Sequence, residues 1–338
     1  MSDLTNKIIE LIKQNKSVNE ICEITNLSNK QLFNIISIIG NSGYLFDKKY
    51  YYDGDIVYTL RNKILNSINN NYAGIITYEG TNNITFILIS DLHFGSKFER
   101  IDLMNVIYDY AIKNDINLIV IGGDLIDGTF GSDKKYENTY DQIKHLLNDY
   151  PFDKNILSFA VLGDHDYSSL KENGQDLSRI LQSYRQDIIP LGYQQGRIRV
   201  KNDSFLINHK FSQTQNDIGI KSIDQIDDGL IIRGHFHEKL SIDKKGKQLV
   251  VTLPPLCDLN KGIVPSFSEM TLFFINNKMN KVEIKHNIIV DNKVNQVSYI
   301  TSDIVPSDNF YDNSLIEKVK VKTKRKDFTK KVNNLKDL

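Results

Sequence analysis

The sequence predicts an α/β fold in which two β-sheets are flanked by helices, preceded by a small N-terminal domain. The apolar runs ITFILIS, INLIVIGG and NILSFAVLG alternate with helical stretches near 99–114, 134–150 and 168–187, a pattern typical of βα units. Beyond about residue 195 helical periodicity largely stops, and strands are predicted in RIRV, SFLINH, GLIIRGHFH, QLVVTL and EMTLFFI. The first sixty residues carry a separate helical pattern.

The N-terminal segment, residues 1–62, predicts three short helices followed by a hairpin. Apolar residues recur at helical spacing in LTNKIIELI and again in LFNIISII, which Gly40 closes. Between them, Ser17 and Glu20 have the spacing of a capping box. An Asp-Gly step then divides YLFDKKYYYDGDIVYTL into two β-prone runs. Helices followed by a two-stranded wing resemble a winged-helix domain.

A winged helix of this composition offers few cations to a nucleic acid. Lys30 lies on the expected recognition helix, and Lys48 and Lys49 lie on the expected wing. These three residues are the candidate nucleic-acid contacts. Docking of a partner protein, or of a second copy of the chain, stays open as an alternative role for this domain.

The rest of the chain divides into a linker, a large domain and a tail. Residues 63–82 are an Asn-rich linker with a strand expected at GIITY, residues 83–300 form the α/β domain, and residues 301–338 form a polar, basic tail. Residues 316–338 hold nine Lys/Arg and three Asp/Glu in a chain of zero net charge. This tail would suit a phosphate backbone or act as a solubilising end.

Several protein classes are disfavoured by the sequence. The two cysteines, Cys22 and Cys257, lie far apart without CxxC spacing, which predicts neither a disulfide framework nor a thiolate zinc site. The N-terminus does not read as a signal peptide, and no apolar run has the length of a membrane span. We therefore expect a cytoplasmic protein without a membrane partner.

Metal-competent side chains follow five of the predicted strands. Five of the seven histidines lie at these strand ends. Ligands collect where the carboxyl ends of strands meet, because the loops there converge on one crevice. The residues are Asp91 and His93 after ITFILIS, Asp124 and Asp127 after INLIVIGG, Asp164, His165 and Asp166 after NILSFAVLG, His209 after SFLIN, and His235 and His237 after GLIIRG.

In order and spacing, this series resembles the calcineurin-like metallophosphoesterase superfamily, including its DNA repair exonuclease-like branch. The matching motifs are Asp-x-His, Gly-Gly-Asp-x-x-Asp, Gly-Asp-His-Asp, His and Gly-His-x-His. The resemblance runs from about Thr85 to the strands near Val290. It implies a β-sandwich flanked by helices, and it does not cover the N-terminal segment or the tail.

The resemblance also implies a role for each residue. Two divalent metal ions would be bridged by Asp124. Manganese is the expected metal, with iron, zinc and magnesium as alternatives. His165 would act as the general acid, and the carboxylate of Asp127 would orient it. The remaining ligands would be Asp91, His93 and His237 on the first metal, and Asp164, His209 and His235 on the second.

These roles make physical sense, although two residues depart from the family pattern. A carboxylate bridges cations well, and paired metals clamp the attacking and leaving oxygens of a phosphate. Asp164 replaces the usual Asn, which adds negative charge and removes an amide donor, so tighter metal binding and a loss of rate or a changed metal preference are expected. Gly128 stands where phosphoprotein phosphatases carry an Arg, which disfavours that branch.

The leading functional prediction is a dinuclear-metal phosphodiesterase or nuclease acting on nucleic acid. One alternative keeps the chemistry but changes the substrate to a small phosphomonoester or a cyclic nucleotide. The other is a catalytically weakened DNA- or protein-binding scaffold, with Asp164 marking the loss of activity.

Overall fold

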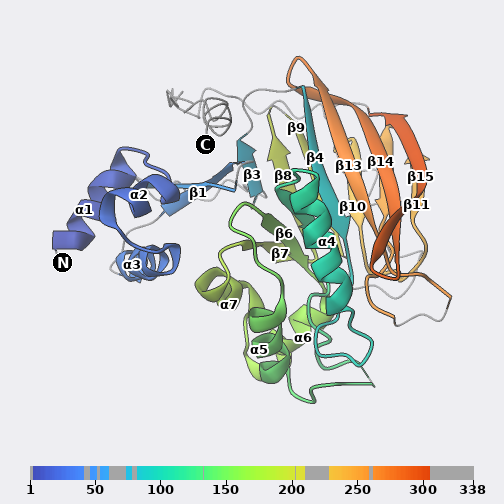
Figure 1. Cartoon of the computed structure of the whole chain (residues 1–338), viewed down its shortest axis with the longest axis horizontal. Coiled ribbons are helices and arrows are strands. Elements are labelled where there is room, and N and C mark those ends of the chain that lie inside the picture. The colour runs from blue at the N-terminus through green and yellow to red at the C-terminus, as the bar shows by residue number, and fades with distance from the viewer. Residues whose placement is uncertain are drawn as a thin grey trace, which may run out of the picture.

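Two β-sheets pack face to face, and helices cover the outer face of one of them (Figure 1). The rings of Phe86 and Phe205 stack at 5.5 Å between the inner faces. The predicted α/β class with two sheets is therefore confirmed. This computed structural model describes residues 3–41, 46–51, 54–60, 74–77, 82–131, 133–201, 203–209, 228–258 and 262–304.

The seven-stranded sheet has the order β15-β14-β13-β4-β5-β6-β7. Strands β4 to β7 run parallel, and β13 to β15 pair antiparallel. A parallel strand buried on both faces reads as a continuous apolar run, which explains ITFILIS and NILSFAVLG. Its strands are β4 (Asn83–Ile89), β5 (Leu118–Ile121), β6 (Leu157–Leu162), β7 (Ile188–Tyr193), β13 (Ser266–Ile275), β14 (Lys278–Val290) and β15 (Lys293–Asp303).

The two faces of this sheet serve different cores. On β4, Phe86 and Leu88 join the core between the sheets, whereas Ile87 and Ile89 pack against the helices. The predicted helical stretch at 168–187 is two helices, because Gly174 adopts a φ of +67° and ends the first. The helices are α4 (Ile101–Lys113), α5 (Thr139–Asp149), α6 (Asp164–Asn173) and α7 (Leu177–Tyr184).

The eight-stranded sheet has the order β11-β12-β10-β9-β8-β3-β1-β2. Within it β10 runs parallel to both β9 and β12, so the carboxyl ends of β9 and β10 lie together. The strands from the α/β domain are β8 (Gln195–Val200), β9 (Asp203–Asn208), β10 (Leu230–Arg233), β11 (Ser241–Lys245) and β12 (Gln248–Thr252).

The N-terminal segment contains the predicted three helices and hairpin. The capping box forms as expected: the Ser17 hydroxyl accepts from the Glu20 amide at 3.2 Å, and the Glu20 carboxylate accepts from the Ser17 amide at 3.0 Å. The elements are α1 (Asp3–Lys13), α2 (Val18–Thr25), α3 (Asn29–Asn41), β1 (Phe46–Tyr51) and β2 (Ile56–Leu60).

The hairpin continues the eight-stranded sheet. Strand β1 pairs with β3 (Gly74–Thr77), which in turn pairs with β8. Tyr50 on β1 packs edge-on against Phe159 on β6, with ring centroids 5.3 Å apart. The winged-helix assignment and the domain boundaries at residues 62 and 82 stay predictions.

Two features at the edges of the sheets were not anticipated. Strand β7 contains Pro190, which hides its strand pattern, but β7 is an edge strand and tolerates a missing amide donor. Strand β15 runs to Asp303, past the predicted domain end at residue 300. The predicted tail lies outside the described residues from 305 onward. Among the helices that the structure describes, none is long and apolar enough to span a membrane.

Candidate metal centre

The seven predicted metal ligands meet where the carboxyl ends of β4, β5, β6, β9 and β10 converge. They form two groups, and within each group the ligand atoms lie within 4.8 Å of one another. Asp124 belongs to both groups. The first consists of Asp91, His93, Asp124 and His237, and the second of Asp124, Asp164, His209 and His235. The structure thus brings together the residues that the family resemblance assigns to two metals.

The first group is nearly closed to solvent. Asp91, His93 and Asp124 are at most 1% exposed. His237 Nε2 lies 3.0 Å from Asp91 Oδ1 and 3.2 Å from His93 Nε2. Burial opposes the charge on Asp91, but His237, His209 and His93 together outweigh it and lower the pKa of Asp91 below its usual value.

The second group is more open on one side. His209 is fully buried, whereas His235 and the side chain of Asp164 are partly exposed. His209 Nε2 lies 2.9 Å from Asp124 Oδ2 and 3.5 Å from Asp164 Oδ1. His235 Nδ1 lies 3.3 Å from Asp164 Oδ1. The Asp164 and His235 side of this group is therefore the side that solvent reaches.

The donor atoms fit divalent cations. His209 Nδ1 lies 2.7 Å from the Gly122 carbonyl oxygen, which can only accept, so Nδ1 carries a hydrogen and Nε2 is left to act as a ligand. That Nε2 is buried, makes no aligned hydrogen bond within the described residues, and faces the carboxylates of Asp91, Asp124 and Asp164. Three buried or half-buried carboxylates around such a nitrogen need cationic charge to offset them.

Metal affinity is expected to rise with pH. Burial opposes protonation of His209, but the carboxylates of Asp124, Asp164 and Asp91 together outweigh it and raise the pKa of His209 well above its usual value. Below that raised pKa the metal-free imidazole keeps a proton that a cation must displace, and above it the proton is already lost. Titrating Mn²⁺ into metal-stripped protein between about pH 6 and pH 9, by calorimetry in buffers of different ionisation enthalpy, measures this proton release. An affinity that does not vary with pH would contradict the expectation.

The ligand backbone is strained in a way that marks a functional site. Five of the seven ligands have positive φ values: Asp91, His93, Asp124, His235 and His237. This left-handed conformation is unfavourable for residues other than Gly and persists where surrounding contacts enforce it. Gly128 adopts a φ of +65°, and a Cβ there would lie 2.3 Å from the His165 carbonyl oxygen. Any side chain at this position would therefore meet the start of α6.

Gly163→Ala is expected to reduce metal affinity by about tenfold or more. The φ of Gly163 is −87°, which suits any residue, but a Cβ would lie 2.1 Å from Asp124 Oδ1 and 2.5 Å from His209 Cδ2. Metal titration with thermal unfolding measures the effect. Gly174→Ala is the matched control: it has free space but a φ of +67°, so it should cost about 1 kcal/mol of stability and leave metal affinity unchanged. Equal metal affinities in the wild-type chain, Gly163→Ala and Gly174→Ala would show that the ligands do not need the free space beside Gly163.

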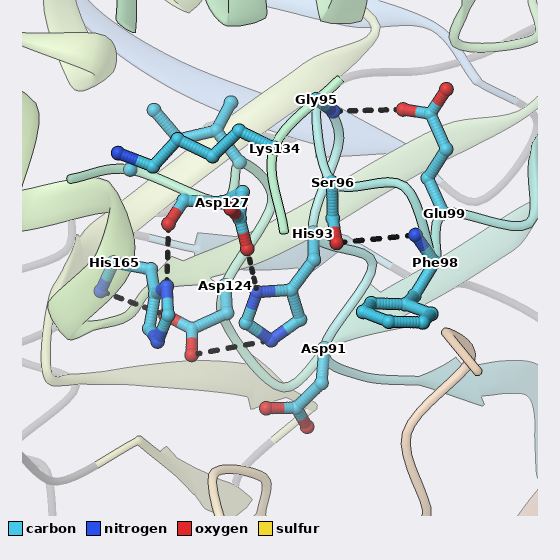
Figure 2. A network of polar contacts seen from close by, with 12 residues as sticks. Asp91, His93, Gly95, Ser96, Phe98, Glu99, Asp124, Asp127, Lys134 and His165 are labelled. Carbon is cyan, nitrogen blue, oxygen red and sulfur yellow. Dashed lines mark hydrogen bonds and ion pairs between the residues drawn. The ribbon is translucent and has the colours of Figure 1, made fainter. Parts of the chain in front are cut away.

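The predicted general acid lies beside both groups, but Asp127 contacts it in an unexpected way. His165 Nδ1 is 2.6 Å from the backbone carbonyl oxygen of Asp127, whereas the Asp127 carboxylate lies 3.3 Å from His93 Nδ1 (Figure 2). The predicted orientation of His165 by that carboxylate is therefore corrected. His165 lies in the first turn of α6, and its ring faces the main chain after β5, where it meets the Asp127 carbonyl.

The charge around His165 favours its protonated form. Burial opposes the imidazolium, but the charge of Asp124, the hydrogen bond to the Asp127 carbonyl and the charges of Asp164 and Asp127 together outweigh it, and the pKa of His165 is raised. Its backbone amide also donates to Asp124 Oδ1 at 3.1 Å. One residue thus supports the shared carboxylate through its main chain and presents its ring as a proton donor.

Asp166 braces the loops that carry the ligands. Its carboxylate accepts from the amides of Gly163 at 2.9 Å, Ile126 at 2.9 Å and Leu125 at 3.2 Å. Burial and the charge of Asp124 raise the pKa of Asp166 to about 7, against the effect of these donors. The start of α6 is thereby tied to the loop after β5.

Other supporting residues were missed by the sequence reasoning. The buried Gln142 accepts from the Gly128 amide at 2.7 Å and donates to its carbonyl at 3.1 Å. Glu99 accepts from the Gly95 amide at 2.7 Å and lies 3.0 Å from His145 Nε2, which fixes the loop after His93. The single signal in the sequence was His145, one of two histidines outside the strand ends.

The three candidate nucleic-acid contacts are not equivalent. Lys30 is exposed on α3, and Lys49 is half-buried on β1. The Lys48 ammonium lies 5.4 Å from the centroid of the Tyr58 ring, and burial lowers the pKa of Lys48. All three lie on α3 or β1, in the N-terminal segment rather than on the loops that carry the ligands.

Comparisons with known proteins place the chain in a family. A comparison with curated proteins gives no match. Similar solved structures include a single-mutant Vps29 from Entamoeba histolytica, at 18% identity and a TM-score of 0.38 over 66% of this chain and 100% of that one. Another is the phosphoesterase YfcE from E. coli, at 12% identity and a TM-score of 0.38 over 64% of this chain and 98% of that one. The calcineurin-like phosphoesterase family model matches residues 84–254, about half of the sequence. The chain belongs to the calcineurin-like phosphoesterase family.

Proposed function

We propose that the chain is a phosphodiesterase that hydrolyses nucleic acid with a dinuclear metal centre, for which manganese is the expected metal. The observation that carries the proposal is the pair of ligand groups that share Asp124, with the His165 ring beside them. Membership of a phosphoesterase family supports hydrolysis of a phosphoester, and its divalent metals suit these donors.

The side chains divide the work of such a reaction. Two divalent cations held by these ligands would supply Lewis acidity and neutralise charge on a phosphate group. His165 Nδ1 faces a carbonyl oxygen that can only accept, so the hydrogen on that nitrogen is fixed. The second proton of the imidazolium therefore sits on Nε2, which is the atom able to protonate a leaving oxygen.

The charge of the site favours a diester over a monoester. Asp91, Asp124 and Asp164 bring three negative charges to two divalent cations, which leaves a formal charge of +1 on the site. A phosphodiester is a monoanion and matches this charge, whereas a monoester dianion exceeds it. The basic residues of 316–338 supply charge for a nucleic-acid backbone, which the acidic remainder of the chain lacks.

A substrate panel tests the proposal. The purified chain is loaded in turn with Mn²⁺, Fe²⁺, Zn²⁺ and Mg²⁺, then assayed on bis(nitrophenyl) phosphate, nitrophenyl phosphate, a cyclic nucleotide, and labelled DNA and RNA. We expect metal-dependent cleavage of the diesters and of a nucleic acid, fastest with Mn²⁺. A preference for the monoester or the cyclic nucleotide would replace nucleic acid with a small-molecule substrate.

The scaffold alternative depends on one residue, the aspartate at position 164. Asp164 Oδ1 faces both His209 and His235, so the ligand position is filled. The residue therefore changes the charge of the site without removing a ligand, which weighs against loss of activity. Docking of a partner protein or of a second copy through α1 to α3 stays a prediction.

A further inference from the structure

One exposed aromatic side chain lies directly beside the proposed general acid. Phe130 is 59% exposed, and its ring meets the His165 ring edge to face at 83°, with centroids 5.4 Å apart. A single exposed hydrophobic residue is ordinary on a protein surface. Phe130, however, contacts the proposed proton donor His165 while more than half of its surface is exposed. This position calls for a more specific explanation.

Hydrogen bonds from α5 and α6 fix the main chain just before Phe130. The Thr129 amide donates to Ser168 Oγ at 2.9 Å, and the same hydroxyl donates to the His165 carbonyl oxygen at 2.6 Å. Gly128 is fixed by Gln142 through its amide and its carbonyl. One hydroxyl therefore ties this loop to the first turn of α6, and the ring keeps its place relative to His165.

We propose that Phe130 is a stacking platform for an aromatic leaving group, in practice the base of the nucleoside released by diester cleavage. The inference rests on the proposed function. Proton transfer requires the leaving oxygen to contact His165 Nε2, so the group attached to that oxygen extends past His165. The exposed Phe130 ring lies beside His165 and is therefore placed to receive it. An exposed aromatic ring can stack on any nucleobase regardless of sequence.

The test compares dinucleotides that differ only in their bases. TpT is assayed with two analogues, each lacking one base, and product analysis shows which nucleoside leaves. The measured quantity is the ratio of kcat/KM for TpT to kcat/KM for the analogue without the leaving-side base. We expect Phe130→Ala and Phe130→Leu each to lower this ratio by about tenfold, and Phe130→Trp to maintain it. Phe152→Ala, which removes a 66% exposed ring from the segment after α5, is the matched control and should leave both activity and ratio unchanged.

Each outcome separates the inference from the function on which it rests. If Phe130→Leu lowers kcat/KM equally on all three substrates, the residue acts only by positioning His165, and the platform is wrong. A kcat/KM ratio that is unchanged in both Phe130→Ala and Phe130→Leu would likewise contradict the proposal. If the wild-type chain cleaves none of the dinucleotides while hydrolysing monoesters, the proposed function itself fails, and the inference fails with it.

Discussion

Asp124→Asn is expected to lower kcat/KM by about a thousandfold on every phosphoester that the wild-type chain hydrolyses. Asp124 is the one side chain common to both ligand groups, and its Oδ2 faces His209 Nε2 at 2.9 Å and His93 Nε2 at 3.9 Å. An amide has no charge to share between two cations, so both groups lose affinity together. The folded state should persist, because the amide oxygen still accepts from the His165 amide.

Metal content, thermal unfolding and activity are measured together on this variant. Asp258→Asn is the control, since Asp258 is an exposed aspartate paired with Arg100 on the surface; it should retain wild-type activity and metal content. Indistinguishable activities of the wild-type chain and Asp124→Asn on every phosphoester would support the scaffold alternative. Loss of activity with full metal content would place Asp124 outside the metal bridge.

The convergence of the ligands was predictable because it follows from chain direction. Strands β4, β5 and β6 are parallel neighbours, so the residues after each of them reach the same edge. His209 and His235 follow β9 and β10, which are also parallel neighbours. Each ligand type was visible in the sequence, and the order of strands within a sheet did not need to be known.

The supporting contacts were not predictable from single positions. Gln142 and Glu99 have the polarity of ordinary surface residues, and only the packing of α5 against the loops after β4 and β5 buries them. The pairing of β1 with β3 depends on a match between distant backbone segments that leaves no periodic signal in either. The carbonyl contact of Asp127 was hidden for a related reason, since every residue has a carbonyl and only the path of the chain aims it.

Removing the His165 ring is expected to slow the reaction in proportion to the basicity of the leaving group. His165→Ala should lower kcat/KM by about a hundredfold to ten-thousandfold on a dinucleotide, whose alkoxide must be protonated as it leaves. On bis(nitrophenyl) phosphate the same variant should lose far less, because nitrophenolate leaves without a proton. The ligand groups should survive, since it is the His165 amide, not its ring, that contacts Asp124.

The pH dependence of the same variant provides a second readout. The neighbouring carboxylates, Asp124 first, and the Asp127 carbonyl together outweigh burial and raise the pKa of His165. The wild-type chain therefore holds the proton on His165 below that raised pKa and loses it as pH rises. On the dinucleotide, kcat/KM should therefore fall at high pH for the wild-type chain but not for His165→Ala. His286→Asn, which changes a histidine on β14 away from the ligands, should keep the wild-type profile. Equal losses on both leaving groups, with the alkaline fall retained, would mean that the proton comes from elsewhere and that His165 serves the site through its main-chain amide alone.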